Sequence, residues 1–259
     1  MAGAEHGEPP TRPPPGGTVD SDEIARFSAL AAEWWDPDGK FRPLHRLNPV
    51  RLACIRDRLC ARYGRDPRSL RALAGLEVLD VGCGGGLVSE PLARMGARVT
   101  AIDASAETVA TAAAHAREGG LAIDYRVMTA EALAAEGRRF DAVVALEIVE
   151  HVADVPLFLR ACTALTRPGG ALFFATLNRT AKSFLFAIVG AEYVLRWLPR
   201  GTHQWDRFIR PSELAEGLSA QGATVVDVAG VTWDALRDEW RLSRDLSVNY
   251  MMYAEKPPA

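Results

Sequence analysis

Short apolar runs alternate with longer amphipathic segments from about residue 76 onward. The runs read LEVLDV (76–81), ARVTAID (97–103), IDYRVM (123–128), FDAVVAL (140–146) and GALFFAT (170–176). Between them, segments such as LVSEPLARMG and SAETVATAAAHAREG have apolar residues at helical spacing and end in glycine, as helices between strands do. This alternation predicts right-handed crossovers, a mostly parallel sheet and a doubly wound α/β fold.

The alternation breaks at about residue 178 and resumes at Pro211. We expect an inserted helical segment over residues 178–207, then a last helix, then two closing strands, GATVVDV (222–228) and SVNYMMYAE (247–255). Two closing strands joined by a short connection favour an antiparallel edge on an otherwise parallel sheet. The prediction is therefore a sheet of seven strands.

The N-terminal part has a different pattern. The first 18 residues, MAGAEHGEPPTRPPPGGT, are rich in Pro and Gly, resemble neither a signal nor a transit peptide, and predict a disordered tail. Two helical patterns follow, DEIARFSALAAEWW and NPVRLACIRDRLCARY, the second with Asn48 as N-cap and Pro49 at the first helical position. We divide the chain into a tail (1–20), an N-terminal helical cap (21–70) and an α/β domain (71–259).

Composition narrows the class of protein. Of the 259 residues, 48% are hydrophobic and 24% are charged, as in ordinary globular proteins, and the formal charge of −3 argues against a nucleic-acid surface. Four scattered cysteines indicate reduced thiols and a cytoplasmic protein. No run reaches the roughly 18 apolar residues that span a bilayer.

A glycine-rich turn, VLDVGCGGG (78–86), follows the first strand of the α/β domain. Its glycines are Gly82, Gly84 and Gly86, and Leu87 stands where a dinucleotide fingerprint requires glycine. Asp80 precedes the turn, and Asp103 ends the next strand, where a carboxylate accepts hydrogen bonds from ribose hydroxyls. This arrangement resembles the class I S-adenosylmethionine-dependent methyltransferases, which implies that Asp80 faces the ammonium group of the donor and Asp103 its ribose.

Further segments resemble a narrower family, the ubiquinone biosynthesis O-methyltransferases. They are WWDPDGKFRPLHRLNPVR (34–51), EIVEHV (147–152), LNRTAKSFLFAIVGAEYVLRWLPRGTH (177–203) and VNYMMY (248–253). The resemblance implies methylation of hydroxyls on polyprenylated aromatic rings, a polyprenyl catechol and 3-demethylubiquinol. It places contacts to S-adenosylmethionine at Arg51, Gly82, Asp103 and Leu146. Trp34 and Trp35 would either close a lid over the donor or serve in ordinary packing of the N-terminal helix.

The stretch ALEIVEHV (145–152) carries the candidate catalytic residues. Glu147, Glu150 and His151 would share one face if a helical turn begins there. One hypothesis makes His151 the general base for the acceptor hydroxyl. The other makes the three residues ligands of a divalent cation, magnesium, zinc or manganese, since the resemblance extends to mitochondrial members described with magnesium at the matching triplet. His203 is a second candidate base, and Trp205 and Phe208 would line an aromatic wall.

The insertion contains the most apolar piece of the chain, KSFLFAIVGAEYVLRWLP (182–199). Glu192 and Arg196 lie one turn apart and mark a polar stripe, so the segment predicts either an interfacial helix on a membrane surface or a buried packing helix. The first reading places the protein peripherally on the inner membrane, beside a lipid-linked substrate and the partners of a biosynthetic complex. Three other functions stay open: a nicotinamide-dependent oxidoreductase, a non-catalytic scaffold, and a methyltransferase for another phenol.

Overall fold

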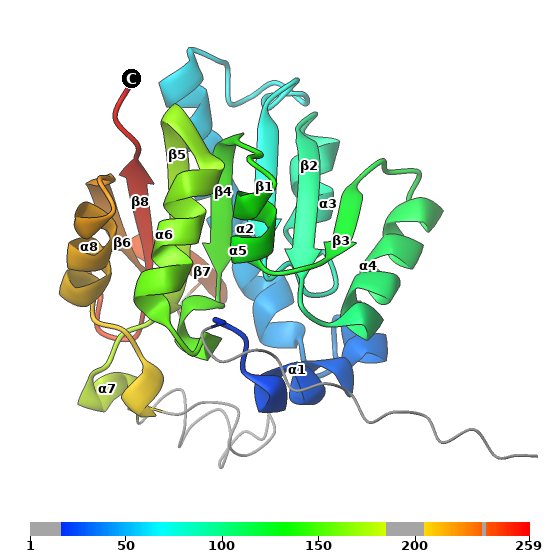
Figure 1. The fold of residues 1–259 in the computed structure, drawn as a ribbon. Helices are drawn as coiled ribbons and strands as arrows, with labels where there is room; N and C mark the ends of the chain where they lie inside the picture. Colours follow the sequence, from blue (N-terminus) through cyan, green and yellow to red (C-terminus); the bar gives the residue numbers. More distant parts are fainter. Residues whose placement is uncertain (1–16, 185–204, 235–236) are drawn as a thin grey trace, which may run out of the picture.

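The computed structural model describes residues 17–184, 205–234 and 237–259 (Figure 1). Its centre is a single sheet in the order β3-β2-β1-β4-β5-β8-β6-β7. The strands are β1 (Glu77–Val81), β2 (Arg98–Asp103), β3 (Asp124–Val127), β4 (Phe140–Leu146), β5 (Thr166–Leu177), β6 (Thr224–Asp234), β7 (Glu239–Ser243) and β8 (Asn249–Glu255). The first five are parallel, and β8 lies antiparallel between β5 and β6. The predicted doubly wound α/β fold is confirmed.

The sheet has one strand more than the sequence predicted. Strand β7 pairs antiparallel with β6 at the edge of the sheet, with Trp233 opposite Trp240. Its sequence, EWRLS, has no apolar run, because an edge strand that is largely exposed needs few apolar residues. Pairing with β6 holds it in place, and Arg46 donates to Asp238, the residue just before β7, at 2.9 Å.

Helices cover both faces of the sheet (Figure 1). They are α1 (Ser21–Ser28), α2 (Arg42–Tyr63), α3 (Ser89–Arg94), α4 (Ala106–Glu118), α5 (Ala130–Ala135), α6 (Val155–Leu165), α7 (Ala181–Ser183) and α8 (Pro211–Ala220), with 3-10 turns η1 (Ala31–Glu33), η2 (Val149–His151) and η4 (Trp205–Arg207). Successive strand residues point to opposite faces, so Val78 packs with α2 and α3 while Leu79 packs with α5, α6 and α8. Each face thus has its own apolar core.

The N-terminal helices differ from the sequence prediction. Helix α2 begins at Arg42, and Pro49 lies inside it. Pro43 occupies the first turn, where a missing N–H costs nothing, so the helix starts about two turns earlier than predicted. Asn48 is a buried mid-helix residue rather than an N-cap: its amide donates to the carbonyl of Leu87 at 2.8 Å and accepts from Arg51. The other predicted helix is split into α1 and η1.

Helix α1 lies across the carboxyl ends of the parallel strands, at the lower edge of the sheet in Figure 1. The chain leaves β1 and β4 at this edge, and it forms the glycine turn after β1 and the turn η2 after β4. In open α/β sheets ligands bind outside these strand ends. Within the described parts of the chain, no helix is long and apolar enough to cross a membrane.

Candidate active site

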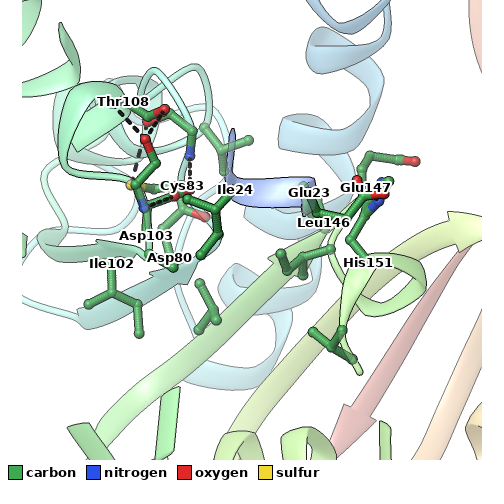
Figure 2. A pocket seen from close by; sticks show the side chains of 18 of the residues that line it. Glu23, Ile24, Asp80, Cys83, Ile102, Asp103, Thr108, Leu146, Glu147 and His151 are labelled. Carbon is green, nitrogen blue, oxygen red and sulfur yellow. Dashed lines mark hydrogen bonds and ion pairs between the residues drawn. The ribbon is translucent and has the colours of Figure 1, made fainter. Parts of the chain in front are cut away.

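A cavity of about 240 Å³ lies at the carboxyl ends of β1, β2 and β4. Its walls come from the N-terminal segment around α1, the glycine turn and the stretch that follows β4. Figure 2 shows two groups of side chains in it: Asp80, Cys83, Asp103 and Thr108 beside the glycine turn, and Glu23, Leu146, Glu147 and His151 at the end of β4. The cavity therefore joins the predicted donor residues to the predicted catalytic ones.

The glycine turn is shaped by backbone conformations that only glycine adopts readily. Gly82, Gly84 and Gly86 have φ angles of +69°, +52° and +88°. The amides of Gly82 and Cys83 donate to the carbonyl of Ile102 at 2.8 and 3.0 Å, which ties the turn to the end of β2. All three predicted glycines are thus required by the backbone of the turn, and the turn borders the cavity as predicted.

Asp103 holds the far side of the turn. Its carboxylate accepts from the amide of Gly84 at 3.0 Å and from the amide of Ser105 at 2.9 Å. Burial raises the pKa of Asp103, and these backbone hydrogen bonds oppose the rise. The carboxylate is thereby fixed at the cavity wall, where two neighbouring hydroxyls can reach its remaining lone pairs.

Asp80 lies deeper, at 3% exposure on β1. Its Oδ2 accepts from the hydroxyl of Ser89, which begins α3. Burial raises the pKa of Asp80 to about 6, although the Ser89 hydrogen bond favours the charged form. A buried carboxylate with this pKa is stabilised when a cation binds beside it.

Two tryptophans pack on the glycine turn. The Trp34 side chain lies so close that an added Cβ would meet its ring at 2.4 Å at Gly84 and its own Cβ at 2.4 Å at Gly85. Trp34 also stacks on Phe41 with 3.8 Å between ring centroids. The indole N–H of Trp35 donates to the carbonyl of Gly85 at 2.9 Å. Both tryptophans therefore contact the turn that borders the cavity.

Arg51 enters the cavity from α2 and is 2% exposed. Its guanidinium donates to Glu147 at 3.1 Å and to Asn48 at 2.6 Å, while Nε has no hydrogen-bond partner among the described residues. Burial lowers the pKa of Arg51, and the nearby carboxylate of Glu147 opposes the change. A buried guanidinium with an unused donor fits an incoming carboxylate.

Glu147 follows β4 with a φ of +53°, a left-handed conformation that costs a non-glycine residue about 1–3 kcal/mol. Its amide donates to the carbonyl of Ala175 at 2.8 Å. Its side chain accepts from Arg51 and, at 3.5 Å, from the amide of Asn249 on β8. The strained backbone thus directs the Glu147 carboxylate toward α2 and β8.

Glu150 and His151 lie on η2 and point to other partners. The carboxylate of Glu150 accepts from the hydroxyl of Thr176 at 2.8 Å, and Nδ1 of His151 lies 3.0 Å from Oε2 of Glu23. Among the described residues, no three His, Cys, Asp or Glu side chains form a group that could hold a metal ion. The three residues share the cavity wall, but in this arrangement they do not fit the predicted metal site.

The charged groups around His151 set its pKa. Burial alone would lower the pKa of His151, but the hydrogen bond to Glu23 and the charges of Glu150 and Glu147 raise it above its ordinary value. Burial and the neighbouring Glu147 raise the pKa of Glu150. Three carboxylates therefore favour the charged form of one imidazole.

Of the other residues predicted for the site, some line the cavity and some lie elsewhere. Leu146 ends β4 and lines the cavity, whereas Phe208 is 1% exposed and packs in the interior rather than along a wall. His203 and residues 185–199 of the apolar segment lie outside the described residues. Sequence reasoning missed Glu23 and Asn249, because an acidic residue on an amphipathic helix and a polar residue starting a strand have no distinguishing pattern.

Comparison with known proteins gives a family model described as a methyltransferase domain, which matches residues 79–174. A ubiquinone biosynthesis O-methyltransferase from Chelativorans sp. (strain BNC1) is 56% identical over 242 residues, covering 93% of this chain and 96% of the relative. The protein of the same description from Brucella ovis is 55% identical over 240 residues, covering 93% and 97%. The similarity includes the helical cap as well as the α/β domain.

Solved structures give the same fold at lower identity. Magnesium protoporphyrin IX methyltransferase from Synechocystis PCC 6803 with bound SAH has a TM-score of 0.61 at 18% identity, over 91% of this chain and 93% of that one. A SAM-dependent methyltransferase from Thermotoga maritima, a possible histamine N-methyltransferase, has a TM-score of 0.60 at 16% identity, over 90% and 99%. At these identities the likeness concerns the fold alone.

Proposed function

The chain belongs to the ubiquinone biosynthesis O-methyltransferase family, and on that premise we propose that it methylates phenolic hydroxyls of polyprenylated aromatic rings. The proposed acceptors are a polyprenyl catechol and 3-demethylubiquinol. The observation that carries the proposal is identity of 56% over 93% of the chain, with 96% of the relative covered. Similarity of this extent includes the residues at both ends of the cavity, not only the generic fold.

The cavity suits the methyl donor, S-adenosylmethionine, which supplies a methyl group on a positively charged sulfur. Asp103 is held by the amides of Gly84 and Ser105 and would accept from the ribose hydroxyls. Asp80 would face the ammonium group, and the buried Nε of Arg51 would donate to the carboxylate. Leu146 would border the adenosine at the end of β4.

The acceptor side of the cavity provides the base. A phenolic hydroxyl is a weak nucleophile while it holds its proton, so proton removal and alignment dominate the reaction. His151 lies on the cavity wall within a cluster of carboxylates that stabilise its charged form. We propose that His151 removes the proton. Glu147, Glu150 and His151 have separate partners, so the proposed reaction uses His151 as a base and not as a metal ligand.

Membrane association belongs to the same proposal. The acceptor carries a polyprenyl tail that stays in the bilayer, so the enzyme would act from the cytoplasm at the inner membrane. Segment 182–199 would form the contact with lipid, and other enzymes of quinone synthesis would lie alongside. The composition of the segment supports this, since a charged stripe among apolar residues is typical of interfacial helices.

The direct test is an assay with purified protein, S-adenosylmethionine and short-chain 3-demethylubiquinol or the matching prenyl catechol. We expect a product heavier by one CH₂ group, detected by mass spectrometry, and restored quinone synthesis in cells that lack their own enzyme. A water-soluble catechol serves as the comparison. Equal kcat/KM for the two acceptors would favour the alternative of a methyltransferase for another small phenol.

Chelation distinguishes the two catalytic hypotheses for the triplet. If His151 acts as a base with the partners described above, exhaustive EDTA treatment leaves turnover unchanged. Loss of turnover that returns on addition of magnesium, zinc or manganese would show instead that Glu147, Glu150 and His151 rearrange around a cation. Donor binding, measured in parallel by calorimetry, controls for general damage.

A further inference from the structure

Glu23 is a buried carboxylate from outside the α/β domain that reaches the active site. It lies on α1, is 6% exposed, and places Oε2 3.0 Å from Nδ1 of His151. Figure 2 shows its side chain beside Glu147 and His151 at the end of β4. Charged residues are rarely buried to this extent unless they are paired, so the contact with His151 accounts for its position.

The segment that carries Glu23 is anchored on both sides of this contact. The amide of Ala153, just after η2, donates to the carbonyl of Thr18 at 2.9 Å. Arg207 of η4 donates to Asp20 at 2.9 Å. The hydroxyl of Ser28, at the other end of α1, contacts the hydroxyl of Ser105 at 2.7 Å. The contacts of Thr18 and Asp20 lie next to Glu23 and hold this end of α1 against the cavity. The Ser28 contact secures only the far end of the helix.

A carboxylate on Nδ1 has a defined effect on a histidine. It keeps the proton of neutral imidazole on Nδ1, fixes the orientation of the ring, and leaves proton acceptance to Nε2. The other charged groups that face His151 are Glu150 from η2 and Glu147 from the turn after β4. Of these, Glu150 accepts from Thr176 and Glu147 accepts from Arg51, whereas the carboxylate of Glu23 lies at Nδ1 of His151.

We propose that Glu23 is a positioning residue that holds His151 with Nε2 toward the acceptor hydroxyl, an inference that rests on the function proposed above. In the reaction the acceptor oxygen gives its proton to Nε2 and forms a bond to the methyl carbon. The carbon–sulfur bond breaks with its electron pair remaining on sulfur, so the donor leaves as a neutral thioether. Glu23 then stabilises the imidazolium until its proton passes to water.

The test compares Glu23→Gln, Glu23→Asp and Glu23→Ala with Ser28→Ala. The first retains the shape of the side chain without its charge, and the last loosens the other end of α1 without touching His151. Single-turnover methylation of the prenyl catechol and the Kd for S-adenosylhomocysteine are measured for each. We expect Glu23→Gln to slow methylation roughly tenfold to hundredfold, a part of the 10²–10⁴ that a general base contributes.

The expected pattern separates positioning from a structural role. Donor affinity should stay within about twofold in Glu23→Gln, since the changed contact lies on the acceptor side. Glu23→Asp, which retains the charge, should be faster than Glu23→Ala, and Ser28→Ala should match the wild type. Equal methylation rates in Glu23→Gln and wild type, or a parallel loss of rate in Ser28→Ala, would overturn the inference. Failure of the wild type to methylate any prenylated phenol would instead overturn the proposed function.

Discussion

At the scale of single residues, we predict that Asp80 makes donor binding depend on pH. Burial raises its pKa to about 6 in the free protein, so below that pH it is protonated and has no charge to offer the donor's ammonium group. We expect the Kd for S-adenosylhomocysteine to rise as pH falls below 6, by up to about tenfold per pH unit. Binding near pH 6 should also release protons, because a bound cation lowers the pKa of the carboxyl.

Calorimetry between pH 5 and 7.5, in buffers of different ionisation enthalpy, measures both effects. The Asp80→Asn variant should bind S-adenosylhomocysteine more weakly at neutral pH, and its Kd should not depend on pH in this range. If the Kd of this variant still depends on pH, Asp103 would be the titrating group. The stability of the free protein depends on pH in the opposite direction to donor binding. A carboxyl with raised pKa favours the folded state at low pH, and this contribution is lost as pH rises through about 6.

The buried pair of Arg51 and Glu147 gives a second prediction at this scale. Glu147→Gln leaves the guanidinium of Arg51, 3% exposed as a side chain, without its counter-charge. We expect the free energy of unfolding to fall by about 3 kcal/mol, at the lower end of the range for a broken buried pair because Glu147 is itself 20% exposed.

Denaturant unfolding with and without S-adenosylhomocysteine tests the role of Arg51. The ligand's carboxylate should replace part of the missing charge, so the loss of stability should be smaller with ligand. An equal loss in both conditions would mean that the carboxylate does not reach Arg51. Glu136→Gln is the control, since it removes a half-exposed partner of Arg126 on the surface and should change stability by under 1 kcal/mol.

At the scale of elements, the contact between Trp34, which follows η1, and the glycine turn connects the helical cap to the donor site. Gly85 does not have a positive φ, so alanine there meets no backbone strain, but its Cβ would approach the Trp34 side chain to 2.4 Å. We expect Gly85→Ala to displace Trp34 and to weaken donor binding at least tenfold, because a cap that cannot close leaves one wall of the cavity open.

A double-mutant cycle identifies the cause of this loss. Since the clash is with the Cβ and the indole of Trp34, Gly85→Ala in a Trp34→Gly background should cost little beyond Trp34→Gly alone. Isothermal calorimetry of all four proteins gives the coupling. Additive losses would show that Gly85 acts on the donor directly and not through the cap.

At the scale of the whole molecule, the cavity draws walls from both the predicted cap (21–70) and the predicted α/β domain (71–259). Donor binding should therefore stabilise the chain as one unit. At 100-fold excess over Kd, S-adenosylhomocysteine should add about 2.7 kcal/mol, raising the single thermal transition by about 5–10 °C.

NAD is the control for the competing oxidoreductase hypothesis and should cause no shift, because Leu87 stands where the dinucleotide fingerprint needs glycine. Differential scanning calorimetry measures both ligands. If two thermal transitions appear and only one responds to the ligand, the chain does not unfold as one unit, and the cap unfolds independently.

The sequence by itself determined the features that depend on local pattern. Short apolar runs between helical segments defined seven of the strands, and Gly82, Gly84 and Gly86 defined the turn, since other residues rarely adopt their positive φ angles. Asp80 and Asp103 could be predicted as donor-site carboxylates from their positions at or near strand ends. Similarity to the family then supplied Arg51 and Leu146, which no periodicity distinguishes.

Tertiary structure alone decided which of these side chains meet. Glu23 contacts His151, and Arg51 and Asn249 contact Glu147, from three elements far apart in the sequence. The same contacts separate Glu147, Glu150 and His151, which their spacing had grouped. Spacing fixes which residues share one face of an element, whereas partners across elements depend on where each helix starts and how it packs. The edge strand β7 arises for the same reason, because its pairing with β6 overrides a weak local signal.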